Sequence, residues 1–558
     1  MKKTTLFLGF LTLISSGFFA QSKVSGNDTE TNVYSKNALT VIILDNNGAY
    51  ISDLKNATHS IILPEKYDAN KIEFPFLSAA STPYAIQQKI DEQKIANQII
   101  AKCYGRDDKT GQFDVELIVK RGIYKGNADE MIKAAASKLA LAKTKNAGVQ
   151  LISNSYIQVI DLRNIVSMEA FYNSEDANNQ AIATEKKKAF KPIERNKNGW
   201  KGEMVSYLYR INSSAIDTLY EKLWIFEDDN AAVKTVKRAA YDKTEFETSF
   251  VLAVDGYIEA SQYNAGNTLA PKAQLSKEEL FSKLINTSVT NALKEIENQF
   301  EPFKIITSIS STHPIIAKIG KKEGLYVDQS FFVIEKVEND KGEIVSRHHS
   351  VIRACKVADN IESENATSKF YQTSGSKIKA GMPIRQRNEI GLGISLGQIN
   401  SNEMGGGYLK LEENLSVLSN LICKNKSHFC IPQLKLFTSL ALDQADYNIN
   451  NVDTAYSFKR FQVGLSKGFH FARYFSVAPF VAIGLESAKL TDSKNGNNFN
   501  TSFLNYGASA SVCISHNAQI ILTLNNYNLL KQASGIDVPT GFANRKGLTY
   551  DFGLRIEL

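Results

Sequence analysis

Strand-length segments in which apolar residues alternate with polar or small ones fill the chain from about residue 387 to residue 558, and they constrain the fold most strongly. In the final segment, 548–558, every second residue is Leu, Tyr, Phe or Ile, and the residues between them are Thr, Asp, Gly, Arg and Glu. The segments 390–397 and 475–486 repeat this pattern. Successive side chains of a strand point to opposite faces, so each segment has one apolar and one largely polar face. Eight such segments predict an antiparallel eight-stranded transmembrane β-barrel.

The connections between these segments favour a barrel over the main alternative, a soluble β-sandwich, which also alternates. If the first strand rises from the periplasm, the connections after strands three, five and seven are external and should be the longer ones. The sequence places long polar stretches there, at about 443–454, 491–500 and 528–546. The connections near His470 and His516 are short. The last strand also resembles the C-terminal assembly signal of bacterial outer-membrane barrels, with Leu558 in place of the usual aromatic residue.

Residues 1–20 have the features of a secretory signal peptide. Lys2 and Lys3 form a charged start, the stretch 6–19 is mostly apolar, and cleavage is expected after Ala20. Beyond this segment there is no run of 18 or more apolar residues, so no transmembrane helix is predicted. Any crossing of a membrane must therefore be made by strands.

The chain ahead of the barrel divides into two regions, which gives a multidomain α+β fold class. Residues 21–303 mix helical and strand patterns and predict a periplasmic mixed α/β region of one or two domains. Helices are expected at 84–101, 129–142 and 276–300, where Ser276 starts the last one, and strands at 112–120, 155–163, 205–211 and 248–254. Residues 304–386 carry short β-like runs, such as 330–335, 343–347 and 351–357, and predict a small closed β domain.

An eight-stranded barrel has an interior just wide enough for side chains, so no solute channel is expected. Eight charged residues fall on the predicted interior side and form a candidate lumen charge network: Lys410, Glu412, Lys435, Arg460, Glu486, Asp551, Arg555 and Glu557. One interpretation is a proton or ion path. The favoured one is mutual neutralisation of buried charges.

Cys423 and Cys430 flank a short polar segment in a predicted periplasmic connection, and their spacing suits a local disulfide in an oxidising compartment. Cys103, Cys355 and Cys513 are scattered and are expected to be buried thiols. Three histidines, His428, His470 and His516, fall in the periplasmic connections. They would form a metal- or pH-sensitive contact with the periplasmic part, or lie in turns by chance, which we favour.

Catalytic and cofactor motifs are not evident in the sequence. There is no GxSxG elbow, HExxH motif, P-loop or dinucleotide-binding GxGxxG. His348 and His349 are adjacent on a predicted strand, so they should point to opposite faces and not share a metal. The net charge of +7 is spread over 65 basic and 58 acidic residues, which argues against nucleic-acid binding. We therefore expect no cofactor, no metal site and no enzymatic activity.

As a whole, the chain resembles uncharacterised outer-membrane β-barrel proteins of Bacteroidota with an N-terminal periplasmic α/β region. Stretches such as 311–314 and 322–324 contribute to this resemblance, which implies a location in the cell outer membrane, with the N-terminal region in the periplasm. Our first hypothesis is a non-enzymatic protein whose barrel, in outer-membrane lipid, anchors a domain that binds envelope proteins or peptidoglycan. The alternatives are a surface-loop adhesin or ligand-capture protein, and an envelope hydrolase with an unrecognised site.

Overall fold

The computed structural model divides near residue 304 into two compact units, which are described separately. The described residues are 37–64, 66–70, 72, 76–122, 145, 148–149, 151–192, 197–226, 229–261, 275–338, 344–363, 366–401, 403–422, 431–449, 452–491, 499–531 and 538–558. Several predicted features lie outside them, namely the signal peptide, the helix at 129–142, the Cys423–Cys430 pair and His428.

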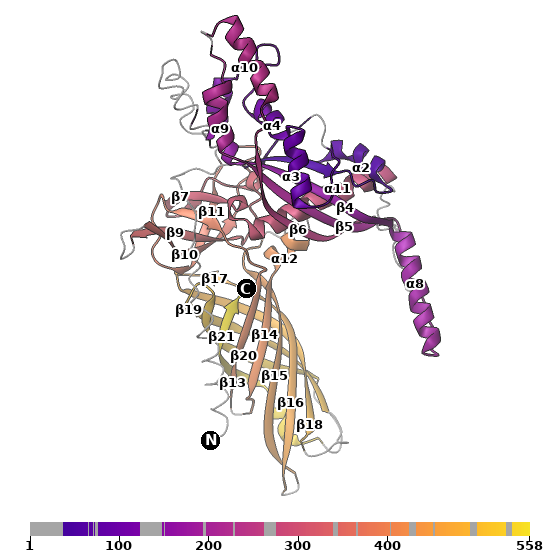
Figure 1. The fold of residues 1–558 in the computed structure, drawn as a ribbon. Coiled ribbons are helices and arrows are strands. Elements are labelled where there is room, and N and C mark those ends of the chain that lie inside the picture. The colour runs from indigo at the N-terminus through magenta and orange to yellow at the C-terminus, as the bar shows by residue number, and fades with distance from the viewer. Residues whose placement is uncertain are drawn as a thin grey trace. The chain divides into compact units, whose positions relative to one another are not determined.

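The first unit is built on a mixed β-sheet with the strand order β2-β1-β4-β5-β6, in which β3 also pairs with β1. Figure 1 labels its strands β4, β5 and β6. Strand β1 is parallel to β2, β3 and β4, whereas β4, β5 and β6 are antiparallel to one another. The strands are β1 (Asn37–Leu44), β2 (Tyr67–Ala69), β3 (Phe76–Leu77), β4 (Ser155–Ser167), β5 (Gly199–Ile211) and β6 (Thr248–Ser261).

Both faces of this sheet are covered, as the wholly buried and largely apolar strand β1 requires. Leu39 and Ile43 belong to the core that includes helix α11, and Ile42 and Leu44 to the core on the other face. The helical segments are α2 (Ile51–Ala57), η1 (Thr58–Ser60), α3 (Pro83–Glu92), α4 (Ile95–Cys103), α5 (Val115–Gly122), α8 (Met168–Glu185), α9 (Ser214–Thr218), η2 (Leu219–Leu223), α10 (Ala231–Lys243), α11 (Lys277–Gln299) and η3 (Glu301–Phe303).

Helix α11 begins where the sequence predicts. Ser276 accepts a hydrogen bond from the Glu279 amide, and the Glu279 side chain bonds back to the Ser276 amide, so both backbone donors at this helix end are satisfied. The helix predicted at 84–101 is instead two helices, α3 and α4, because Lys94 adopts a left-handed conformation between them (φ 53°).

The strand predicted at 112–120 is wrong. This segment contains helix α5, and Asp114 accepts a hydrogen bond from the Leu117 amide at 2.9 Å, as a helix-capping side chain does. The short apolar run in this segment fits either a strand or a buried helix turn, and local capping decides between them.

The second unit starts with a small closed barrel, as predicted for 304–386. Its strand order is β10-β11-β8-β7-β12-β9. Strands predicted at 343–347 and 351–357 form one strand, β10, with a bulge between His348 and Ser350. The elements are β7 (Ile306–Thr312), β8 (Ile315–Ala317), η4 (Lys321–Glu323), β9 (Ser330–Glu338), β10 (Ile344–Lys356), β11 (Ser368–Gly375) and β12 (Pro383–Gln386).

A closed antiparallel barrel of eight long strands follows the small domain, and it confirms the predicted fold class. The sheet closes because β16 pairs with β18 and β13 pairs with β21. The strands are β13 (Leu392–Asn400), β14 (Gly407–Asn414), β15 (Leu434–Ile449), β16 (Val452–Lys467), β18 (Phe475–Leu490), β19 (Phe499–Cys513), β20 (Ala518–Lys531) and β21 (Gly547–Glu557). Three short elements lie in the connections: α12 (Leu415–Ile422), β17 (Phe469–His470) and η5 (Thr540–Asn544).

The outer surface of this barrel is apolar and its interior is polar. Outward-facing side chains that are exposed include Leu396, Leu409, Leu411, Leu440, Phe461, Val463, Val481, Ile483, Leu485, Leu522, Leu524, Tyr550 and Phe552. Inward-facing side chains that are buried include Ser395, Glu412, Lys435, Ser439, Arg460, Glu486, Asn505, Thr523, Asn525 and Asp551. This distribution is the reverse of a water-soluble protein, in which charges face the solvent. Among the described residues, no helix has the length and apolar character needed for a membrane span.

Two terms are used below for the two ends of the barrel. We call the end where β13 begins and β21 ends the domain end, and the end where β15 turns into β16 the hairpin end.

The long polar loop predicted at 443–454 is wrong, because β15 and β16 stay paired up to Ile449 and Val452. Within 443–449 only Ala445 and Tyr447 form an inward apolar face, where they pack against Tyr456 and Phe458. So short an alternation among polar residues resembles a loop in the sequence.

Candidate functional site: the sealed barrel interior

Five of the eight predicted lumen charges form one chain of ion pairs near the domain end. Glu412 contacts Lys410 at 3.1 Å and Arg555 at 3.3 Å. Arg555 also contacts Glu557 at 2.9 Å, and Lys435 lies 3.7 Å from the same carboxylate. The register explains this grouping, because β14, β15 and β21 bring these positions to one end of the interior.

The other predicted lumen residues lie apart from this chain. Arg460 and Glu486 form a separate pair at 2.6 Å, toward the hairpin end. Asp551 lies between the two groups, and its Oδ1 atom has no hydrogen-bond partner in the described part of the chain. The structure therefore brings seven of the eight residues into two ion-pair clusters, and Asp551 lies outside both and forms a hydrogen bond with Asn525.

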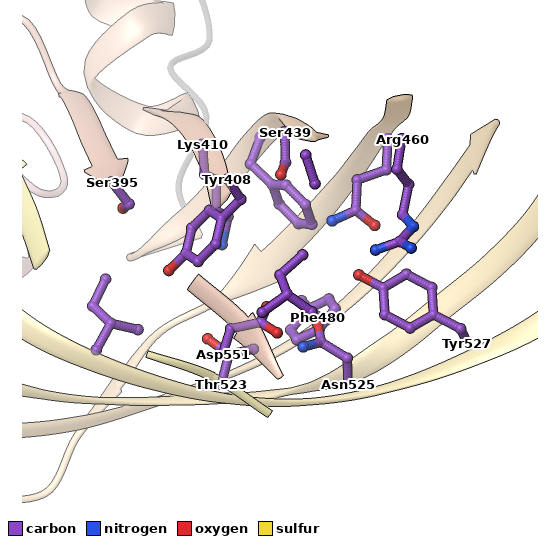
Figure 2. Close-up of a pocket in the computed structure, with 15 residues that line it drawn as sticks. Ser395, Tyr408, Lys410, Ser439, Arg460, Phe480, Thr523, Asn525, Tyr527 and Asp551 are labelled. Carbon is purple, nitrogen blue, oxygen red and sulfur yellow. The ribbon is translucent and has the colours of Figure 1, made fainter. Parts of the chain in front are cut away.

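A cavity of about 20 Å³ lies beside Asp551 (Figure 2). Its walls carry side chains from several strands, among them Ser395, Tyr408, Lys410, Arg460 and Asn525. This volume is enough for roughly one water molecule. It is far below the several hundred Å³ typical of small-molecule sites. The interior therefore has space for solvent, but not for an organic ligand.

At the hairpin end, Arg545 from the connection between β20 and β21 closes the barrel. Its guanidinium contacts Glu486 at 2.9 Å and Asp443 at 2.8 Å, and it lies 3.6 Å from the centre of the Phe458 ring. The Arg545 side chain is only 1% exposed. Phe542, from the same connection, packs with Tyr456 and Phe458. This connection thus folds into the barrel mouth and blocks it.

At the domain end, Arg353 from the small β domain reaches into the opposite mouth. It forms a two-pronged ion pair with Glu389, at 2.6 and 2.8 Å, and a third contact with Glu557 at 3.3 Å. Burial raises the pKa of the Glu389 carboxyl, and the neighbouring Arg353 and Arg387 oppose that rise. Arg353 therefore links the small β domain to the lumen charges and fills this end of the interior.

Asp328 makes the second link between the small β domain and the barrel. Its carboxylate is fully buried and accepts hydrogen bonds from the Gln433 amide at 2.5 Å, from Asn414 at 3.0 Å and from the Tyr371 hydroxyl at 2.8 Å. Asp328 itself has a positive φ of 67°, so its orientation is set by the turn that precedes β9. The two barrels of this unit are therefore held together by buried polar contacts.

Arg353, Glu389, Asp443, Arg545 and Asp328 were not among the residues singled out from the sequence. Four of them lie outside the predicted strands, in segments where polar residues are normally solvated, so nothing in their local pattern indicates burial, and only Arg353 falls within a predicted strand. Charge balance gives no signal of them either, because the eight predicted lumen residues are four cations and four anions. Only the structure shows that Glu486 pairs with two arginines, one of them Arg545.

The first unit contains one notable polar cluster, around Asp161. This fully buried carboxylate contacts Arg163 and Ser81, and accepts a hydrogen bond from Asn46 at 2.8 Å. Arg163 also donates to the Ser81 hydroxyl at 2.5 Å and to the Tyr207 hydroxyl at 3.2 Å. These contacts join Asp161 and Arg163 of β4 to Ser81, which precedes α3, and to Tyr207 of β5. In the described part of the chain, no group of three or more His, Cys, Asp or Glu residues could hold a metal ion.

Comparison with known proteins gives likenesses to solved structures only. No family model matches the chain, and no curated protein matches it. The attachment invasion locus protein Ail of Yersinia pestis is 14% identical, with a TM-score of 0.19, over 30% of this chain and 95% of Ail. The N-terminal β-barrel domain of OprF from Pseudomonas aeruginosa is 11% identical, with a TM-score of 0.18, over 31% of this chain and 100% of that domain. Neisserial surface protein A is 9% identical, with a TM-score of 0.21, over 30% and 94%.

Proposed function

We propose that this chain is a non-enzymatic outer-membrane protein, whose barrel anchors a periplasmic binding or scaffolding region in the cell envelope. The observation that carries the proposal is the inverted distribution of side chains on a closed barrel. Leu, Ile, Val and Phe cover the outside, whereas Glu412, Arg460 and Glu486 are buried inside. An apolar outer surface of this kind is stable in contact with lipid tails and unfavourable in contact with water.

The sealed interior favours an anchor over a transporter. Arg545 closes one mouth, Arg353 closes the other, and the cavity between them has room for about one water molecule. The charges inside neutralise one another through short ion pairs, which is what a buried polar plug requires. The region that precedes the barrel is then the part that binds envelope proteins or peptidoglycan.

Two kinds of connection support an orientation. At the domain end, 468–474 and 514–517 are short, whereas 415–433, which includes α12, is long; at the hairpin end, only the two residues 450–451 join β15 to β16, and 532–546 is the longest connection. Outer-membrane barrels have short periplasmic turns and longer external loops. We infer that the domain end faces the periplasm, which places the small β domain there as well.

Gel mobility and fractionation test this proposal. The full chain is produced in a host with an outer membrane, and its membranes are extracted in detergent and run on a gel with and without boiling. A closed barrel that resists detergent should migrate differently before and after heating, and protease added to whole cells should not cut the small β domain. Recovery in the soluble fraction, with no heat-dependent shift, would instead mean a soluble β fold.

The second candidate is a surface adhesin or ligand-capture protein, and one observation favours it. The hairpin of β15 and β16 remains paired through Ile449 and Val452, at the end that the proposed orientation exposes outside the cell. Shortening this hairpin should abolish surface binding if it is the working part, and should leave it unchanged if the barrel is only an anchor.

A further inference from the structure

Two of the three histidines predicted at the barrel rim face the small β domain. The His516 ring, in the turn between β19 and β20, lies with its Nδ1 atom 3.2 Å from the Ser374 hydroxyl of β11. It also makes a hydrogen bond with the backbone of His348, on β10. The His516 and Phe332 ring centres are 6.1 Å apart, in an edge-to-face arrangement. His516 therefore contacts three strands of the small domain at once.

The charged groups around His516 are mainly positive. Arg387 donates a hydrogen bond to Asn517, next in the chain, at 3.0 Å, and lies over the Phe332 ring. Arg347 and His349, both on β10, also act on His516 electrostatically. The carboxylate of Glu335, on β9, pairs with His349 at 3.0 Å. A positive charge on His516 would thus be half-buried and would repel its surroundings.

We propose that His516 is a pH-sensitive latch between the small β domain and the barrel, which holds the contact when the imidazole is neutral and loosens it when the ring is protonated. This inference goes beyond the anchoring function, because it assigns a regulated contact within the second unit. It does not depend on which membrane the barrel occupies.

The direction of the effect follows from linkage. Burial lowers the pKa of the His516 imidazole, Arg387, His349 and Arg347 act in the same direction, and the hydrogen bond with the His348 backbone opposes them. Released into water, the ring would return to its ordinary pKa of about 6.5. The docked state therefore binds fewer protons, so the contact is at full strength above that value and weakens as the pH falls below it.

His470, the other rim histidine, does not share this role. Its ring lies 5.0 Å from that of Tyr371, and burial lowers its pKa to about 4. It therefore remains neutral across the range in which His516 changes charge. The buried contacts of Arg353 and Asp328 also persist, so protonation of His516 should loosen the interface locally and not separate the two barrels.

Hydrogen exchange of the full chain in detergent micelles or nanodiscs tests the proposal. Amide protection of β11 and of the turn 514–517 is measured at about pH 7.5 and about pH 5.5, after correction for the intrinsic pH dependence of exchange. The native chain should show several-fold faster corrected exchange at the lower pH. H516Q keeps a polar side chain but cannot titrate, so its corrected exchange should not change with pH. H313Q is the matched control, because His313 is exposed on the same small domain.

Each outcome bears on the latch. A pH response in the native chain and in H313Q, together with none in H516Q, supports it. Equal rates at both pH values in the native chain would overturn it. A response that survives in H516Q would assign the sensitivity to another group, such as His348 or His349, and would also overturn the role of His516.

Discussion

At the scale of single residues, two glutamates that each contact two arginines determine how the charges inside the barrel are neutralised. Glu486 accepts contacts from both Arg460 and Arg545, and Glu557 from both Arg555 and Arg353. In each case one arginine comes from a strand of the barrel, and the other comes from outside the barrel wall: Arg545 from the connection between β20 and β21, and Arg353 from β10 of the small β domain. The seal at each mouth is therefore also the neutralising partner of an interior carboxylate.

Arg545→Met should destabilise the barrel by about 3 kcal/mol, because removing one member of a buried ion pair leaves its partners uncompensated. Asp443 would lose its ion-pair contact of 2.8 Å, although Glu486 would keep Arg460. The temperature at which the heat-resistant gel band disappears measures this loss. Arg473→Met is the matched control, since Arg473 is exposed in the connection at the other end. Equal stability of the two variants would contradict the assignment of Arg545 as a structural seal.

Arg353 and Glu389 should be energetically coupled, since their contact is two-pronged and both side chains are almost wholly buried. A double-mutant cycle of Arg353→Met and Glu389→Gln should give a coupling energy above about 1.5 kcal/mol, the lower bound measured for close charge pairs at interfaces. Urea unfolding of the full chain provides the four stabilities. Additive effects of the two substitutions would show that the pair adds little to docking.

At the scale of elements, alternation in the sequence was enough to predict the barrel strands and which side chains face inward. It succeeds because side chains in a strand have a period of two and the strands of this closed barrel have an apolar outer face and a polar inner face. It does not predict the strands at 443–454, where only Ala445 and Tyr447 mark the inward face, or the helix at 112–120, where a short apolar run fits a strand and a helix turn equally well. The partners Arg353 and Arg545 could not be predicted, because long-range contacts leave no local periodicity.

The outward face of β18 separates a membrane barrel from a soluble one. Ile483 is 64% exposed and lies near the middle of the strand. In a bilayer, Ile483→Lys should cost about 2 to 4 kcal/mol, whereas an exposed substitution in a soluble protein usually changes stability by less than about 0.5 kcal/mol. Leu548→Lys, at the hairpin end of β21, is the control and should cost at most about 1 kcal/mol. Urea unfolding in lipid vesicles measures both, and equal small effects would argue against a membrane location.

At the scale of the whole molecule, the small β domain and the barrel form one compact unit, and the contacts between them are polar and buried. Arg353 contributes to this contact through Glu389 and Glu557, and Asp328 through Asn414 and Gln433. A buried polar contact is stable only while every member keeps its partners. The small domain is therefore a structural part of the barrel's closed end and not a tethered neighbour.

Cooperative unfolding is the consequence that can be measured. In the full chain, loss of the heat-resistant barrel band and loss of amide protection in β9 and β10 should occur at the same urea concentration. Asp328→Ala removes the acceptor for Gln433, Asn414 and Tyr371, leaving three buried donors unsatisfied, and should split this into two transitions with the small domain unfolding first. Asp359→Ala is the control, because its pairing with Lys321 stays within the small domain's side of the unit and is exposed to solvent. Two separate transitions already present in the unmodified chain would mean that the buried contacts are too weak to couple the two barrels. A single transition that persists in Asp328→Ala would assign the coupling to Arg353 and its carboxylate partners alone.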